Sequence, residues 1–402
     1  MFNGLTDKTL DRRLKFLWYV RACGADNASM YKLYCHYNDI QELYEDTEYD
    51  KGVKLSDITL RNLTDKRLDD HFELYKLCMV LGMGLVCYED EHFPKKLKKI
   101  KRPPLLLFYK GKYADFDKML CAGMVGTRSM TDYGKKTAEY LAEGLAGCGV
   151  CVVSGLAKGI DGTCQRAAVN CGGFTVGVLG NSIDTIYPKE NAALFNKLYS
   201  HGLVISEYWP GCKTNKYSFP ERNRIIAGLS DFLIVVEAPA NSGALLTATA
   251  AKAQGKPVYV PPMPLTVENA GTTALLRGGA KMISSVSGIL EEYDSVLPHT
   301  IPPDAPLPSL KGDEGEEELP SYTTSAARRE YAYNFVLEEL DSNGPETLLQ
   351  LLSKTKQFTL KDLIKAVTAL EMDGFVKKKA GGYYDSVPED KVPRTLLKDN
   401  NK

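Results

Sequence analysis

The feature that most constrains the fold is a series of short, wholly apolar runs between residues 119 and 260. Continuous rather than alternating apolarity is typical of strands buried on both faces, as in a parallel sheet covered by helices. The runs cover residues 119–125, 150–154, 175–179, 203–206, 232–237 and 257–260. The segment after the first run has the helical period, as a crossover helix requires. The spacing therefore predicts an α/β domain over residues 113–293, with a Rossmann-like, doubly wound, mostly parallel sheet.

The rest of the chain divides by composition. Residues 1–112 are polar and have a helical pattern, and residues 294–324 are proline-rich and then acidic, too polar to bury a core. We expect the second of these segments to be a linker. Residues 325–387 combine three helical stretches with two short β-like arms around a Gly-Gly turn, which indicates a winged helix. Residues 388–402 are expected to form a tail.

The charge pattern and the cysteine content exclude several classes of protein. With 50 Lys and Arg against 51 Asp and Glu, the net charge of −1 selects no partner, so a nucleic-acid surface has to be a local patch. The N-terminus lacks the basic head and apolar core of a signal peptide, and charges interrupt every apolar stretch before ~18 residues accumulate. We expect a cytoplasmic protein without membrane contact. Cys148 and Cys151 form a C-x-x-C motif without the second pair that a zinc site needs, so no metal is predicted.

Glycine-rich and polar loops follow four of the six predicted strands. In an open α/β sheet, ligands bind beyond the carboxyl ends of the strands, where backbone N–H groups can hold an anion. Any one of these loops, taken alone, could be nothing more than a tight turn between a strand and a helix. Four of them at one sheet edge predict a site for an anion or a phosphate backbone. The candidate residues in these loops are Gly126, Thr127, Arg128, Ser154, Gly155, Asn241, Ser242 and Gly243.

A second candidate cluster lies between residues 216 and 226, where cations alternate with aromatic side chains. This pattern suits a nucleic-acid strand, because the charges follow the phosphates while the rings stack on bases. The candidates are Lys216, Phe219, Arg222, Asn223 and Arg224. In the alternative, Phe219 belongs to the core. One of the two arginines would then pair with Glu207 or Glu237.

Motifs of several enzyme classes are missing from the sequence. There is no G-x-x-x-x-G-K-[ST] loop, and residues 123–129 lack the G-x-G-x-x-G spacing of a dinucleotide site. The histidines avoid the glycine-rich loops, and no Ser-His, Cys-His or metal constellation is visible. The sequence therefore predicts a binding protein that is not an enzyme and carries no cofactor.

Taken together, the motifs of the central domain resemble those of the DNA-processing protein A family, also called DprA or Smf. The blocks occur in the family's order at residues 125–128, 154–162, 178–191, 206–208, 219–224 and 242–248. The resemblance implies a protein that binds single-stranded DNA without sequence specificity and loads the RecA recombinase during DNA uptake in natural transformation. It also implies a homodimer through the central domain.

The resemblance assigns roles to four residues. Arg128 is expected to hold a phosphate from the G-[ST]-R loop, and Lys189 is the basic residue after the Tyr-Pro pair. Lys216 and Phe219 match the lysine and the aromatic residue before the R-N-R block. The hypothesis is that these cations and Arg222 bind phosphates while Phe219 stacks on a base.

The chain departs from the residues that are usual in the family at three places in the central domain. Cys164-Gln165 stands where histidine is usual, Pro261-Pro262 where Pro-Gly is common, and Thr273 where Asn is frequent. The N-terminal helices resemble a sterile-alpha-motif-like or helix-hairpin-helix region, but the Gly-x-Gly hairpin is degenerate near residues 23–25.

Two other functions use the same sheet edge. One is an enzyme that hydrolyses N-glycosidic bonds of nucleotides, with Glu207 or Glu237 as acid or nucleophile. The other is a sensor that binds a nucleotide without turnover. For the predicted winged helix, a DNA contact and a protein-docking or structural role remain equally open, because acidic residues accompany the lysines of its third helix.

Overall fold

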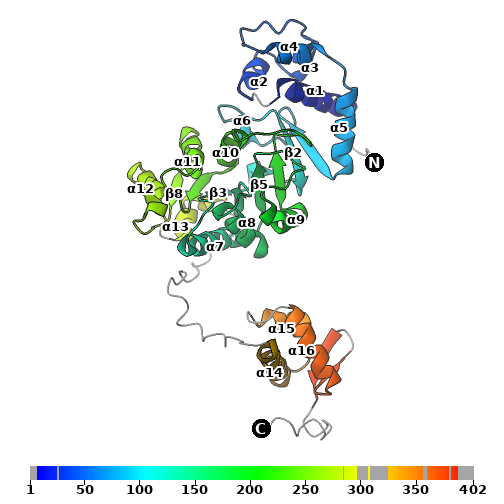
Figure 1. Cartoon of the computed structure of the whole chain (residues 1–402), viewed down its shortest axis with the longest axis vertical. Coiled ribbons are helices and arrows are strands. Elements are labelled where there is room, and N and C mark those ends of the chain that lie inside the picture. Colours follow the sequence, from blue (N-terminus) through cyan, green and yellow to red (C-terminus); the bar gives the residue numbers. More distant parts are fainter. Residues whose placement is uncertain are drawn as a thin grey trace. The chain divides into compact units, whose positions relative to one another are not determined.

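The chain forms two compact units in the computed structural model, Met1–Pro308 and Ser309–Lys402. Figure 1 shows the elements of each unit. The structure describes residues 7–24, 27–283, 285–296, 307, 325–355, 360–379 and 382–387. Most of the predicted linker and the predicted tail lie outside these residues. None of the helices among the described residues is both long and apolar enough to cross a membrane.

A nine-stranded sheet organises the first unit, with the strand order β1-β2-β6-β5-β4-β3-β7-β8-β9. Each of the six predicted apolar runs contains a strand, and these strands pair in parallel. The strands are β3 (Cys121–Val125), β4 (Cys151–Ser154), β5 (Thr175–Leu179), β6 (Leu203–Ser206), β7 (Phe232–Val235) and β8 (Val258–Val260). Every residue of these strands is buried, which explains why the runs are apolar throughout. The predicted doubly wound, mostly parallel α/β sheet is confirmed.

Three further strands extend the sheet at its edges. β1 (Met83–Cys87) and β2 (Leu106–Gly111) form an antiparallel pair, and β2 runs antiparallel to β6. At the other edge, β9 (Lys281–Met282) pairs in parallel with β8. The sheet therefore begins before residue 113, the predicted start of the α/β domain. The division of the chain into domains stays a prediction.

Helices cover the two faces of the sheet (Figure 1). α7 (Asp132–Gly147), α8 (Ile160–Asn170) and α9 (Ala192–His201) lie on one face, and α10 (Ser218–Leu229) and α11 (Ala244–Ala253) lie on the other. The sequence sets the start of α7, because the Thr131 side chain accepts the Gly134 N–H as an N-cap and Asp132 complements the helix dipole. Its predicted apolar face, including Leu141 and Leu145, is buried.

The shorter elements of the sheet region lie at its margins. Along the chain they are α6 (Lys95–Lys98), η1 (Phe116–Lys118), η2 (Lys189–Asn191), η3 (Val267–Asn269), α12 (Ala270–Arg277), α13 (Val286–Leu290) and η4 (Glu291–Val296). Of these, α6 packs against α10, since Leu97 and Ile100 lie against Gly228.

Before β1, the described residues form five helices. They are α1 (Asp7–Cys23), α2 (Asn27–Tyr34), α3 (Ile40–Glu45), α4 (Asp57–Thr64) and α5 (Asp69–Val80). Their apolar side chains join one core with residues of β1, β2 and α9, in which Trp18 and Phe108 are almost fully buried. The N-terminal helices are thus packed onto the sheet rather than separate from it.

The second unit has its own core and its own small sheet. Its elements are α14 (Ser325–Asn343), β10 (Glu346–Thr347), α15 (Leu348–Ser353), α16 (Leu360–Met372), β11 (Val376–Lys378) and β12 (Tyr383–Ser386). The strand order is β10-β12-β11, and both pairs are antiparallel. Three helices and an antiparallel hairpin occur as expected from the sequence. The winged-helix assignment stays a prediction.

Candidate functional site

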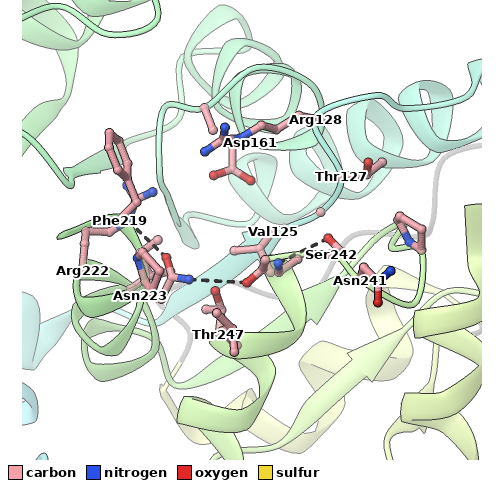
Figure 2. A pocket seen from close by; sticks show the side chains of 18 of the residues that line it. Val125, Thr127, Arg128, Asp161, Phe219, Arg222, Asn223, Asn241, Ser242 and Thr247 are labelled. Atoms are coloured by element: carbon pink, nitrogen blue, oxygen red, sulfur yellow. Dashed lines mark hydrogen bonds between the residues drawn. The ribbon is translucent and has the colours of Figure 1, made fainter. Parts of the chain in front are cut away.

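A pocket of about 610 Å³ lies beyond the carboxyl ends of β3 and β7. These strands are neighbours, but the chain continues from β3 through α7 to β4 on one side and from β7 through α11 to β8 on the other. The direction of winding therefore reverses between them, and open α/β sheets bind their ligands at this reversal point. The pocket is lined by the loop after β3, the loop after β7 and the first turns of α10 and α11 (Figure 2).

A second pocket of about 510 Å³ lies at the ends of β4 and β5. The two pockets share the lining residues Arg128, Ala157, Tyr187, Phe219 and Arg222. They therefore form one continuous depression across the ends of β5, β4, β3 and β7, which we call the groove.

The predicted site residues fall into three sets. The first pocket brings together Gly126, Thr127, Arg128, Lys216, Phe219, Arg222, Asn223, Asn241, Ser242 and Gly243. Gly155 and Lys189 line the second pocket. Ser154 and Arg224 line neither pocket.

Backbone contacts fix the loop that carries Arg128. The Thr127 N–H donates to the Glu237 carbonyl oxygen at 2.8 Å, and the Thr127 carbonyl accepts from the Ile160 N–H at 3.1 Å. The approach of the second loop requires glycine at position 159, where φ is +80° and a Cβ would lie 2.3 Å from the Thr127 oxygen. The loop is thus held from two sides, while the Arg128 side chain is exposed.

The buried Glu237 side chain holds the other end of this loop. Its carboxylate accepts hydrogen bonds from the backbone N–H and the hydroxyl of Thr131, at 3.0 and 3.2 Å. Burial raises the pKa of Glu237, and the hydrogen bonds from Thr131 oppose that shift. Glu237 therefore stabilises the start of α7 and does not line the groove.

An aromatic pair lies where the two pockets meet. The rings of Tyr187 and Phe219 are 5.7 Å apart between centroids and tilted by 55°. Phe219 is half-buried, and Tyr187 is 50% exposed. The sequence did not single out Tyr187 as a site residue, although it directly precedes Pro188 in the Tyr-Pro block. Its exposed ring and that of Phe219 can support a flat ligand group.

Arg222 is part of the groove wall and is buried. Its Nη1 donates to the carbonyl oxygens of Gly155, at 2.9 Å, and Val178. Burial lowers the pKa of Arg222 to about 10, which the nearby Asp161 carboxylate opposes. Burial also raises the pKa of Asp161, and Arg222 opposes that shift. Arg222 thus braces the ends of β4 and β5, and Asp161 offsets much of its charge.

Arg224 points elsewhere. Its guanidinium makes ion pairs with Glu207 at 2.6 Å and Glu221 at 3.0 Å, and its side chain is only 9% exposed. Burial lowers the pKa of Arg224, but the two carboxylates outweigh burial and leave the pKa above its ordinary value. Arg224 is therefore the arginine that pairs with Glu207, as in the alternative that the sequence left open.

Ser154 is fully buried, and its hydroxyl donates to the Met124 carbonyl oxygen. This contact ties β4 to β3 below the groove. Ser154 therefore supports the site without facing it.

The loop after β7 forms the remaining wall. Asn223 of α10 donates to the Gly243 carbonyl oxygen at 3.5 Å, and Ser242 Oγ accepts from the Ala244 N–H at 3.3 Å (Figure 2). These contacts join the first turns of α10 and α11. Figure 2 shows Arg128 across the opening from Asn223, with Asn241 and Ser242 on the side of the β7 loop.

Four exposed cations line the groove: Arg128, Lys158, Lys189 and Lys216. Lys158 was not among the predicted site residues, although it lies in the glycine-rich loop after β4. Since Arg222 is balanced by Asp161, these four side chains supply the positive charge that a ligand meets, and the exposed Glu190 of the second pocket adds one carboxylate beside them. A row of exposed cations beside an aromatic pair can hold a polyanion that carries flat rings.

The doubly wound sheet with a cationic groove at its reversal point places the chain among the Rossmann-like proteins. Within that class, the chain belongs to the DNA recombination-mediator protein A family, whose model matches residues 84–294. This confirms the resemblance seen in the sequence.

Named relatives agree with this membership. The DNA processing protein DprA of Bacillus subtilis is 40% identical over 212 residues, which cover 52% of this chain and 71% of the relative. The protein Smf of Escherichia coli is 32% identical over 304 residues, covering 74% of this chain and 76% of the relative. The crystal structure of DprA from Streptococcus pneumoniae superposes with a TM-score of 0.62 at 31% identity, covering 69% of this chain and 97% of that one.

Proposed function

We propose that this protein binds single-stranded DNA without sequence specificity in the groove. The observation that carries the proposal is the combination of four exposed cations with the Tyr187–Phe219 pair at the reversal point of the sheet. Cations along a groove follow a phosphate backbone, and exposed rings stack on bases of any sequence. A duplex would present its bases already stacked, so the aromatic pair favours an unpaired strand.

Each part of the groove has a role in this proposal. Arg128, Lys189 and Lys216 hold phosphates, as the sequence predicted, and Lys158 adds a fourth phosphate contact. The ring of Phe219 stacks on a base with Tyr187 beside it. The N–H groups of the Gly126 and Gly243 loops lie at the same edge, where glycine lets a backbone approach closely. Arg222 positions the ends of β4 and β5 beside them.

The rival enzymatic function is disfavoured by the contacts of its two proposed carboxylates. Glu207 is paired with Arg224, and Glu237 accepts hydrogen bonds from Thr131. Neither residue lines either pocket. A nucleophile or general acid has to reach the substrate, so we propose a non-catalytic protein. Incubation with nucleoside monophosphates should release no free base.

Family membership supports a proposal for what the protein does with the bound strand. A recombination mediator hands single-stranded DNA to a recombinase, so we propose that this protein promotes loading of RecA in natural transformation. We also propose a homodimer through the sheet region. Two grooves on one strand would then increase affinity through effective concentration.

The first test is a gel shift with a single-stranded oligonucleotide. The Arg128→Ala variant should bind about 10- to 100-fold more weakly, because a charge-assisted contact to phosphate is lost. The control is Lys135→Ala, which removes an exposed cation of α7 that lines neither pocket. It should bind like the wild type. Wild-type affinity in Arg128→Ala would refute the groove as the binding site.

A further inference from the structure

A strongly basic segment outside the groove has no role in the function proposed so far. Residues 95–102 contain six cations in eight positions and include the short helix α6. They are Lys95, Lys96, Lys98, Lys99, Lys101 and Arg102. None of them lines the groove.

This basic segment lies along α10. Leu97 and Ile100 are buried against Gly228, near the end of α10, and Arg102 makes an ion pair at 3.1 Å with Glu221, in its first turn. The segment therefore follows α10 from its last turn to its first. Because Gly228 and Glu221 are seven residues apart on α10, this distance is ~10 Å. The first turn of α10 also carries Phe219, which lines the groove, so the basic segment ends close to the groove. Figure 1 shows α6 beside α10.

Half of the cations in the segment are committed to contacts within the protein. Lys96 pairs with Asp231 at 2.6 Å, and Arg102 pairs with Glu221. The Lys98 ammonium lies 5.1 Å from the centre of the Tyr88 ring. These contacts hold the segment in place and leave its remaining charge at the surface.

The other three cations face the solvent. Lys95, Lys99 and Lys101 are exposed, and within the described part of the chain none of them makes an ion pair. The nearby Asp117 carboxylate accepts the backbone N–H of Lys95, not its ammonium group. Three exposed like charges on one short segment form a local positive field, in a protein whose net charge is close to zero.

We propose that Lys95, Lys99 and Lys101 form a second contact surface for the phosphate backbone of the same DNA strand, where the strand leaves the groove along α10. This proposal rests on the proposed function. Phe93 is almost fully buried, and Tyr88 is half-buried with the Lys98 ammonium over its ring, so neither ring is free to stack on a base there. The contact is therefore electrostatic, unlike the contact in the groove.

The proposal predicts that the mode of binding depends on the length of the DNA strand. A short strand fills the groove and does not reach the basic segment, whereas a long strand covers both. Each phosphate contact on a single strand adds ~0.7 to the slope of log affinity against log salt. A long strand should therefore show a slope steeper by about 2 than a short one, owing to the three lysines.

The experiment compares the triple variant Lys95→Gln, Lys99→Gln, Lys101→Gln with the wild type. Glutamine keeps most of the side-chain length and removes the charge. A matched control carries Gln at Lys112, Lys135 and Lys197, three exposed lysines distant from α10. Affinities are measured across a salt series for oligonucleotides of about 6 and about 30 nucleotides, a range that spans typical site sizes. Arg128→Ala is measured in parallel.

The triple variant should bind the short strand like the wild type and the long strand roughly tenfold or more weakly, with the slope for the long strand reduced by about 2. The control triple should change neither. Equal affinity of the triple variant and the wild type for the long strand would overturn the second surface and leave the groove intact. Equal loss for both lengths would also overturn it, since the lysines would then act on the groove. Failure of the wild type to bind either strand would overturn the proposed function itself.

Discussion

Arg222 and Arg224 are two positions apart on α10 and have different surroundings. Side chains two apart on a helix point to nearly opposite sides, so only one of them can face the groove. Arg222 faces it and donates to the carbonyl groups at the ends of β4 and β5, while Arg224 pairs with Glu207 and Glu221. Both are buried and hydrogen-bonded within the protein. Their removal should first affect stability, whereas removal of the exposed Arg128 should first affect binding.

The Arg224→Ala variant tests this distinction. It leaves the carboxylate of Glu207 buried without its guanidinium partner, which should cost about 3–5 kcal/mol of unfolding free energy. Urea unfolding measures this loss, and the variant's DNA affinity, measured where it is still folded, should stay near that of the wild type. Arg128→Ala is the control and should change stability by no more than about 0.5 kcal/mol. Wild-type stability with lost binding in Arg224→Ala would instead place Arg224 on the DNA.

At the scale of elements, the ends of the strands determine where the loops begin, and contacts between the loops then fix their positions. The clearest case is the contact of the second loop with the first, where the Ile160 N–H meets the Thr127 carbonyl and Gly159 has no room for a side chain. The position of Arg128 therefore depends on the loop after β4, as well as on its own.

Replacement of Gly159 by alanine should disturb both stability and binding. Its Cβ would clash with the Thr127 and Arg128 carbonyl groups, in addition to the cost of a positive φ. Gly172→Ala is a matched control, since Gly172 has φ +84° and no atom within 4 Å of the added Cβ. Gly159→Ala should be less stable than the control by about 1–3 kcal/mol, by urea unfolding. It should also bind DNA more weakly, and equal behaviour of the two variants would contradict the locking of the loops.

The strands show what a sequence pattern can and cannot predict. Those buried on both faces, such as β3 and β7, leave an apolar run that identifies them. β9 has only two residues, both exposed, and leaves no pattern. The first half of β2 is apolar and buried, but its second half contains Lys110 and is half-buried, and its antiparallel partners β1 and β6 are set by long-range pairing. The same holds for the site, where the loops could be predicted from their glycines, but the sequence could not decide which arginine pairs with which glutamate.

At the scale of the whole molecule, the two units have separate cores. The three hydrophobic cores of the first unit use residues from 14 to 290, and the core of the second unit uses residues from 332 to 376. Every residue that lines the groove belongs to the first unit. The first unit is thus expected to fold alone, because its cores are built from its own residues.

Deletion of residues 309–402 should therefore leave binding of a short single strand unchanged. The four exposed cations of the groove predict a slope of about −2.8 for log affinity against log salt, in the full chain and in the shortened one. A filter-binding series at several salt concentrations measures both slopes. A shallower slope after deletion would show that the second unit supplies phosphate contacts, for which the exposed Lys377 and Lys378 of β11, and the adjacent Lys379 that pairs with Asp385, are the candidates. Equal slopes with weaker duplex binding would assign those lysines to double-stranded DNA, the contact that a winged helix would make.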